Sequence, residues 1–182
     1  MKELALHILD VAENSLRVKA PEVRVSVVEQ WRENRMEITI EDNGEGMDAD
    51  RVIQAGDPFF TTRRTRRVGM GLPLFKQHAE MAGGTFSLTS QLGKGTITHA
   101  TFQLDHPDRQ PMGDLAGVII LLATGGSTTE VIMNYETPEG QYQFSSAEAK
   151  EILEVNKLAG HELGQQLKEL LALNIKELKP RA

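Results

Sequence analysis

Two runs of alternating apolar residues, separated by a short polar stretch, constrain the fold of this chain most strongly. The apolar positions are Val23, Val25 and Val27 in the first run and Met36, Ile38 and Ile40 in the second. A period of two places these side chains on one face of a strand, and residues 32–35 between the runs are all polar. We therefore predict a β-hairpin with one apolar face.

The residues before this hairpin follow a helical period instead. Seven apolar residues and one serine recur at helical spacing: Leu4, Ala5, Ile8, Leu9, Val11, Ala12, Ser15 and Leu16. They predict a helix over 3–18 with a broad apolar face. A separate polar line on the same helix contains Glu3, His7, Asp10, Asn14 and Arg17.

Further elements are predicted between the hairpin and residue 105. The pattern indicates a short helix near 49–55 and a second helix over 72–81. Strands are expected over 85–89 and 96–104.

The pattern changes after residue 105. Residues 106–111 are polar, contain two prolines and are typical of a linker. We therefore expect a domain over 1–105 and a separate C-terminal segment over 112–182. That segment is predicted to contain a helix over 112–123, a hairpin of 131–135 with 141–144, a helix over 146–155 with an N-cap serine, and a last helix over 161–178.

The last predicted helix has one apolar stripe. Its members are Leu163, Leu167, Leu170, Leu171, Ile175 and Leu178. Such a stripe favours burial, either in the core or in the interface of a homodimer, over a cofactor site.

Composition excludes several classes of function. The formal net charge of −6 argues against nucleic-acid binding, which usually requires a basic face. The chain has no cysteine, which excludes disulfides, zinc–thiolate sites and cysteine nucleophiles. The N-terminus has no apolar signal core, and the longest apolar run, 118–123, is too short to span a bilayer. We expect a cytoplasmic protein that binds neither membranes nor nucleic acids.

The first candidate binding element, Asp42-Asn43-Gly44-Glu45-Gly46-Met47, comes directly after the second strand. A carboxylate at a strand end can accept a hydrogen bond from an exocyclic amine. The two glycines let the backbone approach a flat ring where a Cβ would collide. Taken alone, these residues are more typical of an ordinary Asp-Asn-Gly turn.

Two further elements favour metal and phosphate chemistry. Asp10 and Asn14 lie four residues apart on the polar line, which projects their oxygens to one place, and a carboxamide oxygen suits Mg²⁺. Arg17, one turn on, can meet a phosphate. Taken alone, this line is more typical of a solvated helix face. Gly69 and Gly71 open the helix over 72–81, where free N–H groups and the helix dipole favour an anion.

The order of these elements is more specific than any one of them. Along the chain come Asn14, the Asp42 element, Asp57-Pro58-Phe59-Phe60-Thr61-Thr62, Gly69-Met70-Gly71-Leu72 and Gly93-Lys94-Gly95-Thr96. Residues 5–104 thereby resemble the catalytic ATP-binding domain of sensor histidine kinases, with its N, G1, F, G2 and G3 boxes. DNA gyrase, the Hsp90 chaperones, MutL and the anti-sigma-factor kinases share this superfamily (GHKL). The resemblance implies an α/β sandwich, with a mixed, mainly antiparallel sheet, helices on one face, and ATP between helices and a lid.

The resemblance also implies roles for single residues. Asn14 matches the Mg²⁺-binding asparagine, Arg17 a residue that contacts phosphate, and Asp42 the residue that binds the adenine amino group. Asp10 stands where gyrase-type hydrolases place a water-activating glutamate. The other positions assigned to nucleotide binding fall into four groups. Gly44, Gly46 and Met47 follow Asp42, and Thr96 lies near adenine. Phe59 and Phe60 lie at the base of the lid, followed by Thr61, Thr62 and Arg63, and the phosphate site contains Gly69, Met70, Gly71 and Leu72.

The chain departs from the family pattern at several points. No upstream segment with an acceptor histidine is found, so phosphotransfer is expected to need a separate protein, and His7 is expected to be an ordinary helix-face residue. Pro73 replaces the third glycine of the G2 box, which a first helical turn tolerates at the loss of one N–H. Four arginines within 63–67 predict either a solvated loop or a surface for phosphates or an acidic partner.

Three functions follow from these features. The first is a stand-alone, Mg-ATP-dependent protein kinase that phosphorylates a partner protein in signalling. The second is an ATP/ADP-sensing regulatory module that binds its partner without phosphotransfer. The third is a slow ATPase switch in which Asp10 activates water.

Overall fold

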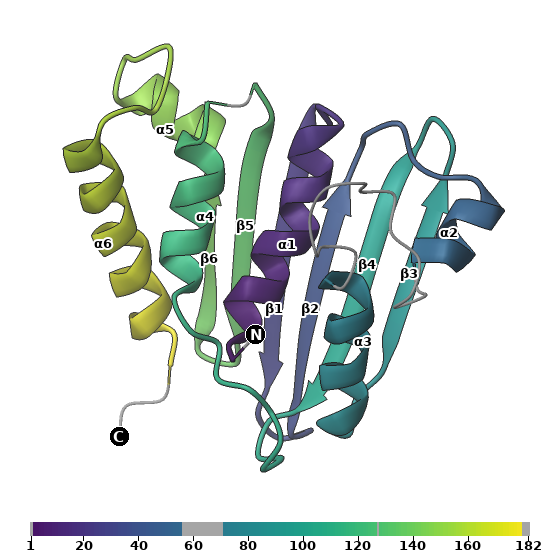
Figure 1. The fold of residues 1–182 in the computed structure, drawn as a ribbon. Coiled ribbons are helices and arrows are strands. Elements are labelled where there is room, and N and C mark those ends of the chain that lie inside the picture. Colours follow the sequence, from purple (N-terminus) through teal and green to yellow (C-terminus); the bar gives the residue numbers. More distant parts are fainter. Residues whose placement is uncertain (1, 56–70, 127, 180–182) are drawn as a thin grey trace.

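Six strands form one mixed sheet in the computed structural model, which describes residues 2–55, 71–126 and 128–179 (Figure 1). The strands are β1 (Glu22–Gln30), β2 (Arg35–Asp42), β3 (Phe86–Gln91), β4 (Gly95–Gln103), β5 (Glu130–Thr137) and β6 (Gly140–Ser145). Their order across the sheet is β3-β4-β2-β1-β5-β6. β1 is parallel to β5, and every other neighbouring pair in this sheet is antiparallel. The expected mixed, mainly antiparallel sheet is confirmed.

Helices cover one face of this sheet. The helices of the described residues are α1 (Leu4–Arg17), α2 (Ala49–Ala55), α3 (Gly71–Met81), α4 (Leu115–Thr124), α5 (Ser146–Ile152) and α6 (His161–Glu177). α1, α3, α4 and α6 run side by side over the face, and α2 lies at the edge beside β3 (Figure 1). The predicted two-layer α/β sandwich is therefore confirmed. None of these helices has the length and apolarity needed to cross a membrane.

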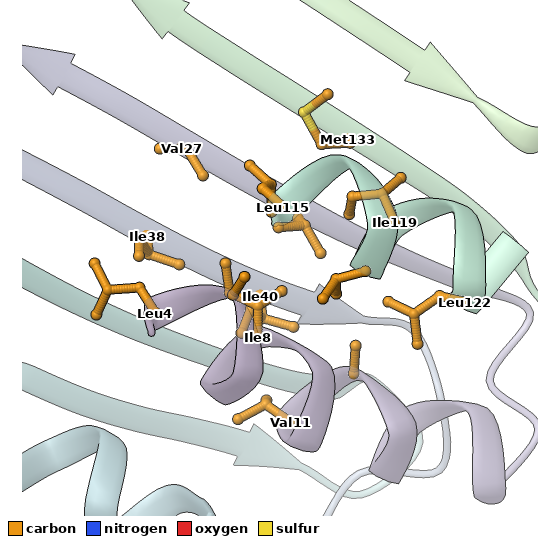
Figure 2. Packing of buried hydrophobic residues seen from close by; sticks show 14 of the residues in the cluster. Leu4, Ile8, Val11, Val27, Ile38, Ile40, Leu115, Ile119, Leu122 and Met133 are labelled. Carbon is orange, nitrogen blue, oxygen red and sulfur yellow. The ribbon is translucent and has the colours of Figure 1, made fainter. Parts of the chain in front are cut away.

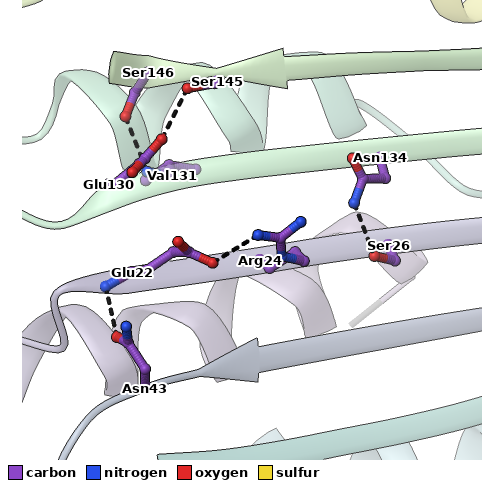
Figure 3. Close-up of polar contacts among 9 residues, drawn as sticks. All are labelled: Glu22, Arg24, Ser26, Asn43, Glu130, Val131, Asn134, Ser145 and Ser146. Atoms are coloured by element: carbon purple, nitrogen blue, oxygen red, sulfur yellow. Dashed lines mark hydrogen bonds and ion pairs between the residues drawn. The ribbon is translucent and has the colours of Figure 1, made fainter. Parts of the chain in front are cut away.

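The two faces of the sheet differ in the way the alternating pattern predicts. Val23, Val25 and Val27 of β1 are fully buried beneath the helices. Arg24 and Ser26 between them lie on the open face, where Arg24 pairs with Glu22 and Ser26 accepts a hydrogen bond from Asn134 (Figure 3). The open face is thus held together by polar side chains.

The core lies between the sheet and the helix layer. Leu4 and Ile8 of α1 and Ile119 of α4 pack over Ile38 of β2 and Met133 of β5, and all five are completely buried (Figure 2). Burial of each such side chain contributes about 1.5–3 kcal/mol to stability. α1, which contains Asp10 and Asn14, is therefore held rigidly on the sheet.

The C-terminal segment extends the same sheet. β5 pairs in parallel with β1, so the outer edge of the first hairpin is covered by a strand more than 90 residues further along the chain. α4 packs against α1 on one side and α6 on the other. Pairing between β1 and β5 joins both parts of the chain in one sheet. The expected division into two domains at residues 106–111 stays a prediction.

Three local predictions need correction. α4 begins at Leu115, three residues later than predicted. The N-cap of α5 is Ser145, whose Oγ accepts from Glu148 N, and the helix ends at Ile152, three residues earlier than predicted. In the stripe of α6, Leu171 is completely buried, but Leu170 is 53% exposed. The stripe packs against α4 and β6 through its remaining members, so it is narrower than the sequence predicts.

Candidate functional site

The predicted binding residues of the described chain gather at one end of the sheet. Asp42 closes β2 and lies directly across from Thr96, near the start of β4. The C-terminal half of α1 reaches Asp42 through Ser15. α3 begins beside α1, and a Cβ on Gly71 would lie only 3.2 Å from Asp10 Oδ2. Four elements that are distant in sequence thus meet around one place.

The carboxylate of Asp42 is fixed on both sides. Ser15 Oγ donates to Oδ2 at 2.6 Å, and Gly44 N donates to Oδ1 at 2.9 Å. Asp42 is half-buried at the edge of the helix layer. A carboxylate has about four lone-pair positions, so it can still accept a further hydrogen bond from a ligand amine.

The glycines after Asp42 are required by close backbone packing. Gly46 has a φ of +67°, and a Cβ there would come within 2.0 Å of Gln91 O. Gly95 has a φ of +100°, and its Cβ would lie 1.9 Å from Asp42 O. The two glycine loops are therefore pressed against the ends of β2 and β3, and any side chain at either position would force them apart.

Gly44 limits the site in a different way. Its backbone N–H bonds Asp42, and a Cβ at this position would lie 2.9 Å from Asp42 Oδ1 and 3.2 Å from Ala20 Cβ. A side chain here would thus displace the carboxylate itself. The neighbouring Asn43 Oδ1 accepts from Glu22 N at 2.8 Å, which ties the loop to β1 (Figure 3).

Thr96 and Met47 are linked through one hydroxyl. Ser90 Oγ accepts from Met47 N at 2.8 Å and lies 2.9 Å from Thr96 Oγ1. Ser90 Oγ also donates to Gly95 O at 2.8 Å. Ser90 was not singled out from the sequence, although it holds both glycine loops in place.

The polar line of α1 faces the start of α3. Asn14 and Arg17 are exposed, and Arg17 Nη1 donates to Asn14 Oδ1 at 3.1 Å. Asp10 is half-buried against Gly71. Among the described residues, no three histidine or acidic side chains form a metal cluster.

The anion site is predicted at the start of α3. Gly71 is the first residue of the helix, and the half-buried Leu72 packs against the core. Pro73 is third, within the first turn, where a missing N–H breaks no helical hydrogen bond. The predicted residues Phe59, Phe60, Thr61, Thr62, Arg63, Gly69 and Met70 lie outside the described residues.

The expectation for His7 is wrong. His7 is completely buried, and its Nε2 lies 3.1 Å from Gln110 Oε1 and 2.9 Å from His78 Nδ1. Its ring stacks on Phe75, with a centroid distance of 5.2 Å. Burial, together with the neighbouring His78, lowers the pKa of His7 to about 4. His7 and His78 thus join α1 to α3. Their contact lies at the opposite end of each helix from Asn14 and Gly71.

Comparison with known proteins identifies the family. Residues 2–107, more than half of the chain, match the family described as "Histidine kinase-, DNA gyrase B-, and HSP90-like ATPase". The chain belongs to this family of ATPases. Its family membership implies that it binds ATP.

Several curated relatives of this ATPase domain are sensor kinases. An uncharacterized sensor-like histidine kinase of Rhizobium meliloti is 38% identical over 77 residues, which cover 40% of this chain and 15% of that protein. The C4-dicarboxylate transport sensor protein DctB of Pseudomonas aeruginosa is 29% identical over 98 residues, or 53% of this chain and 16% of that protein. Sporulation kinase E of Bacillus subtilis is 38% identical over 64 residues, or 35% of this chain and 8% of that protein.

These matches span only a small part of each relative. They cover about a sixth or less of each of these three relatives. A solved histidine kinase domain from Erythrobacter litoralis matches 57% of this chain and 44% of its own at 19% identity, and its TM-score of 0.43 adds nothing to the family match.

Proposed function

We propose that this ATPase-family protein binds ATP together with Mg²⁺ and transfers the γ-phosphate to a separate protein. The observation that carries the proposal is the fixed carboxylate of Asp42 at the place where α1, β2, β4 and the start of α3 meet. An acceptor held in this way is suited to the exocyclic amine of adenine. A side chain at Gly44 would displace this carboxylate, since its Cβ would lie 2.9 Å from Asp42 Oδ1.

The triphosphate would extend from Asp42 toward α1 and α3. The free N–H groups at the start of α3 and the dipole of this helix favour the negative charge of phosphates. The exposed Asn14 supplies an amide oxygen for the magnesium ion, which neutralises phosphate charge when bound, and Arg17 beside it offers a guanidinium to the phosphates. Catalysis by these residues is mainly positioning and charge stabilisation.

In the transfer step, the bond between the γ-phosphorus and the β,γ-bridging oxygen breaks, and a new bond forms to a nitrogen or oxygen of the acceptor. ADP is the leaving group. Two of the chain's five histidines, His7 and His78, are engaged with each other. The acceptor in this proposal lies on another protein.

A labelling experiment tests this function. The full chain is incubated with ATP labelled at the γ-phosphate and with an extract of the source organism, in parallel with Asp42→Ala. The proposal predicts a labelled protein other than the chain itself, and no label with the variant. Release of free phosphate without a labelled protein would indicate an ATPase instead. Binding of ATP without either product would indicate a nucleotide-sensing module.

A further inference from the structure

Ser15 is the one polar residue within the apolar line of α1. It lies three positions after buried Ala12, and the residue is only 5% exposed. A hydroxyl at such a place destabilises the fold unless it is hydrogen-bonded. Its partner is Asp42, 27 positions further along the chain, at 2.6 Å. The serine therefore connects the rigid core helix to the candidate adenine acceptor.

The geometry restricts the carboxylate of Asp42 to one orientation. Ser15 holds Oδ2, and the N–H of Gly44 holds Oδ1. If the hydroxyl were missing, only the bond from the N–H of Gly44 would remain of these two. The carboxylate could then rotate about its terminal bond, and its orientation would have to be fixed when a ligand binds.

We propose that Ser15 is a positioning residue for adenine recognition: its hydroxyl holds Asp42 ready to accept a hydrogen bond from the 6-amino group of the base. This inference rests on the proposed function, because it presumes that Asp42 binds adenine. Ser15 does not touch the nucleotide in this role. Ser15 removes the entropy cost of ordering the Asp42 side chain when a ligand binds. It therefore raises the affinity only of ligands that form a hydrogen bond with that carboxylate.

The expected effect follows from the cost of ordering one side chain. Ser15→Ala should weaken ATP binding by about 2- to 10-fold. Alanine is smaller than serine and favours helix, so the variant retains α1. Ser15→Thr keeps the hydroxyl and should bind ATP within about 2-fold of the unmodified protein, which a purely steric role for the serine would not allow.

The decisive comparison uses purine riboside triphosphate, which lacks the 6-amino group but keeps the ring and the phosphates. Calorimetry measures its affinity and that of ATP for the unmodified chain and for Ser15→Ala. The inference predicts a loss for ATP and an unchanged affinity for the purine analogue. An equal loss for both ligands would show a structural role and overturn it, as would an unchanged affinity for ATP.

The same data separate this inference from the proposed function. If the unmodified chain binds both ligands equally, Asp42 does not read the amine and the inference on Ser15 fails, whereas a labelled partner protein would still support the proposed function. If Asp42→Ala weakens ATP binding but Ser15→Ala does not, the proposed function stands and the role of Ser15 is refuted.

Discussion

Protonation of His7 should destabilise the fold in a defined pH range. His7 is completely buried between α1 and α3, stacked on Phe75 and beside His78. Its pKa in the folded chain is lowered from 6.5 to about 4, first by burial and then by His78. The unfolded chain therefore binds a proton at a pH where the folded chain does not. Stability from the neutral ring is present above pH 6.5 and is lost as the pH falls from there to about 4.

The magnitude follows from the size of this pKa change. At 1.36 kcal/mol per pH unit, a decrease from 6.5 to about 4 corresponds to about 3 kcal/mol. This is a large share of the 5–15 kcal/mol by which a typical domain is stable. Burial also lowers the pKa of His78.

Urea unfolding between pH 3.5 and 7.5 measures this effect, with His7→Gln as the matched variant. Titration of the carboxylates elsewhere contributes equally to both proteins and cancels in the difference. The stability of the unmodified chain relative to the variant should rise by about 3 kcal/mol between pH 4 and 6.5 and stay constant above this range. Parallel curves for the two proteins would refute the claim that His7 is buried in its neutral form.

Three further perturbations test the site and its supports. Asp10→Asn should lower ATP hydrolysis at least about tenfold if Asp10 activates water, and an unchanged rate would exclude that role. Gly46→Ala should lower the free energy of unfolding by about 1–3 kcal/mol more than Gly93→Ala does. Both glycines have a positive φ, but an added Cβ would collide only at Gly46. Equal losses of stability for the two variants in urea unfolding would contradict this packing. Glu29→Ala leaves the buried hydroxyl of Tyr135 without its acceptor and should cost about 2–4 kcal/mol in the same assay, whereas a cost below about 0.5 kcal/mol would show that their contact is unimportant.

Periodicity was sufficient to predict most elements of the fold. The alternation in 23–27 and 36–40 predicted both the hairpin and its buried face, because a half-buried strand must repeat every two residues. The parallel pairing of β5 with β1 was not predictable in this way. The apolar residues in 131–135 indicate a strand, but they do not show which edge of the sheet the strand joins.

Only part of the candidate site could be predicted, because the sequence pattern shows local features and not contacts across the fold. Asp42 and its glycines stand out because their residue types and spacing are tied to local backbone chemistry. Ser15 was grouped with the apolar face, since its bond to Asp42 depends on a contact across the fold. The pairing of His7 with His78, 71 positions apart, was missed for the same reason. A single polar residue in an apolar line was the available signal in the case of Ser15.

The affinity of Asp42→Ala for ATP is the most direct test of the account. Glu41→Ala is the matched control, because Glu41 is the preceding residue of the same strand and is exposed on the open face. A hydrogen bond to a charged group contributes about 1.5–3 kcal/mol, so calorimetry should show ATP binding at least about tenfold weaker for Asp42→Ala and unchanged for Glu41→Ala. ATP binding by Asp42→Ala within about twofold of the unmodified chain would contradict the assignment of Asp42 as the adenine acceptor.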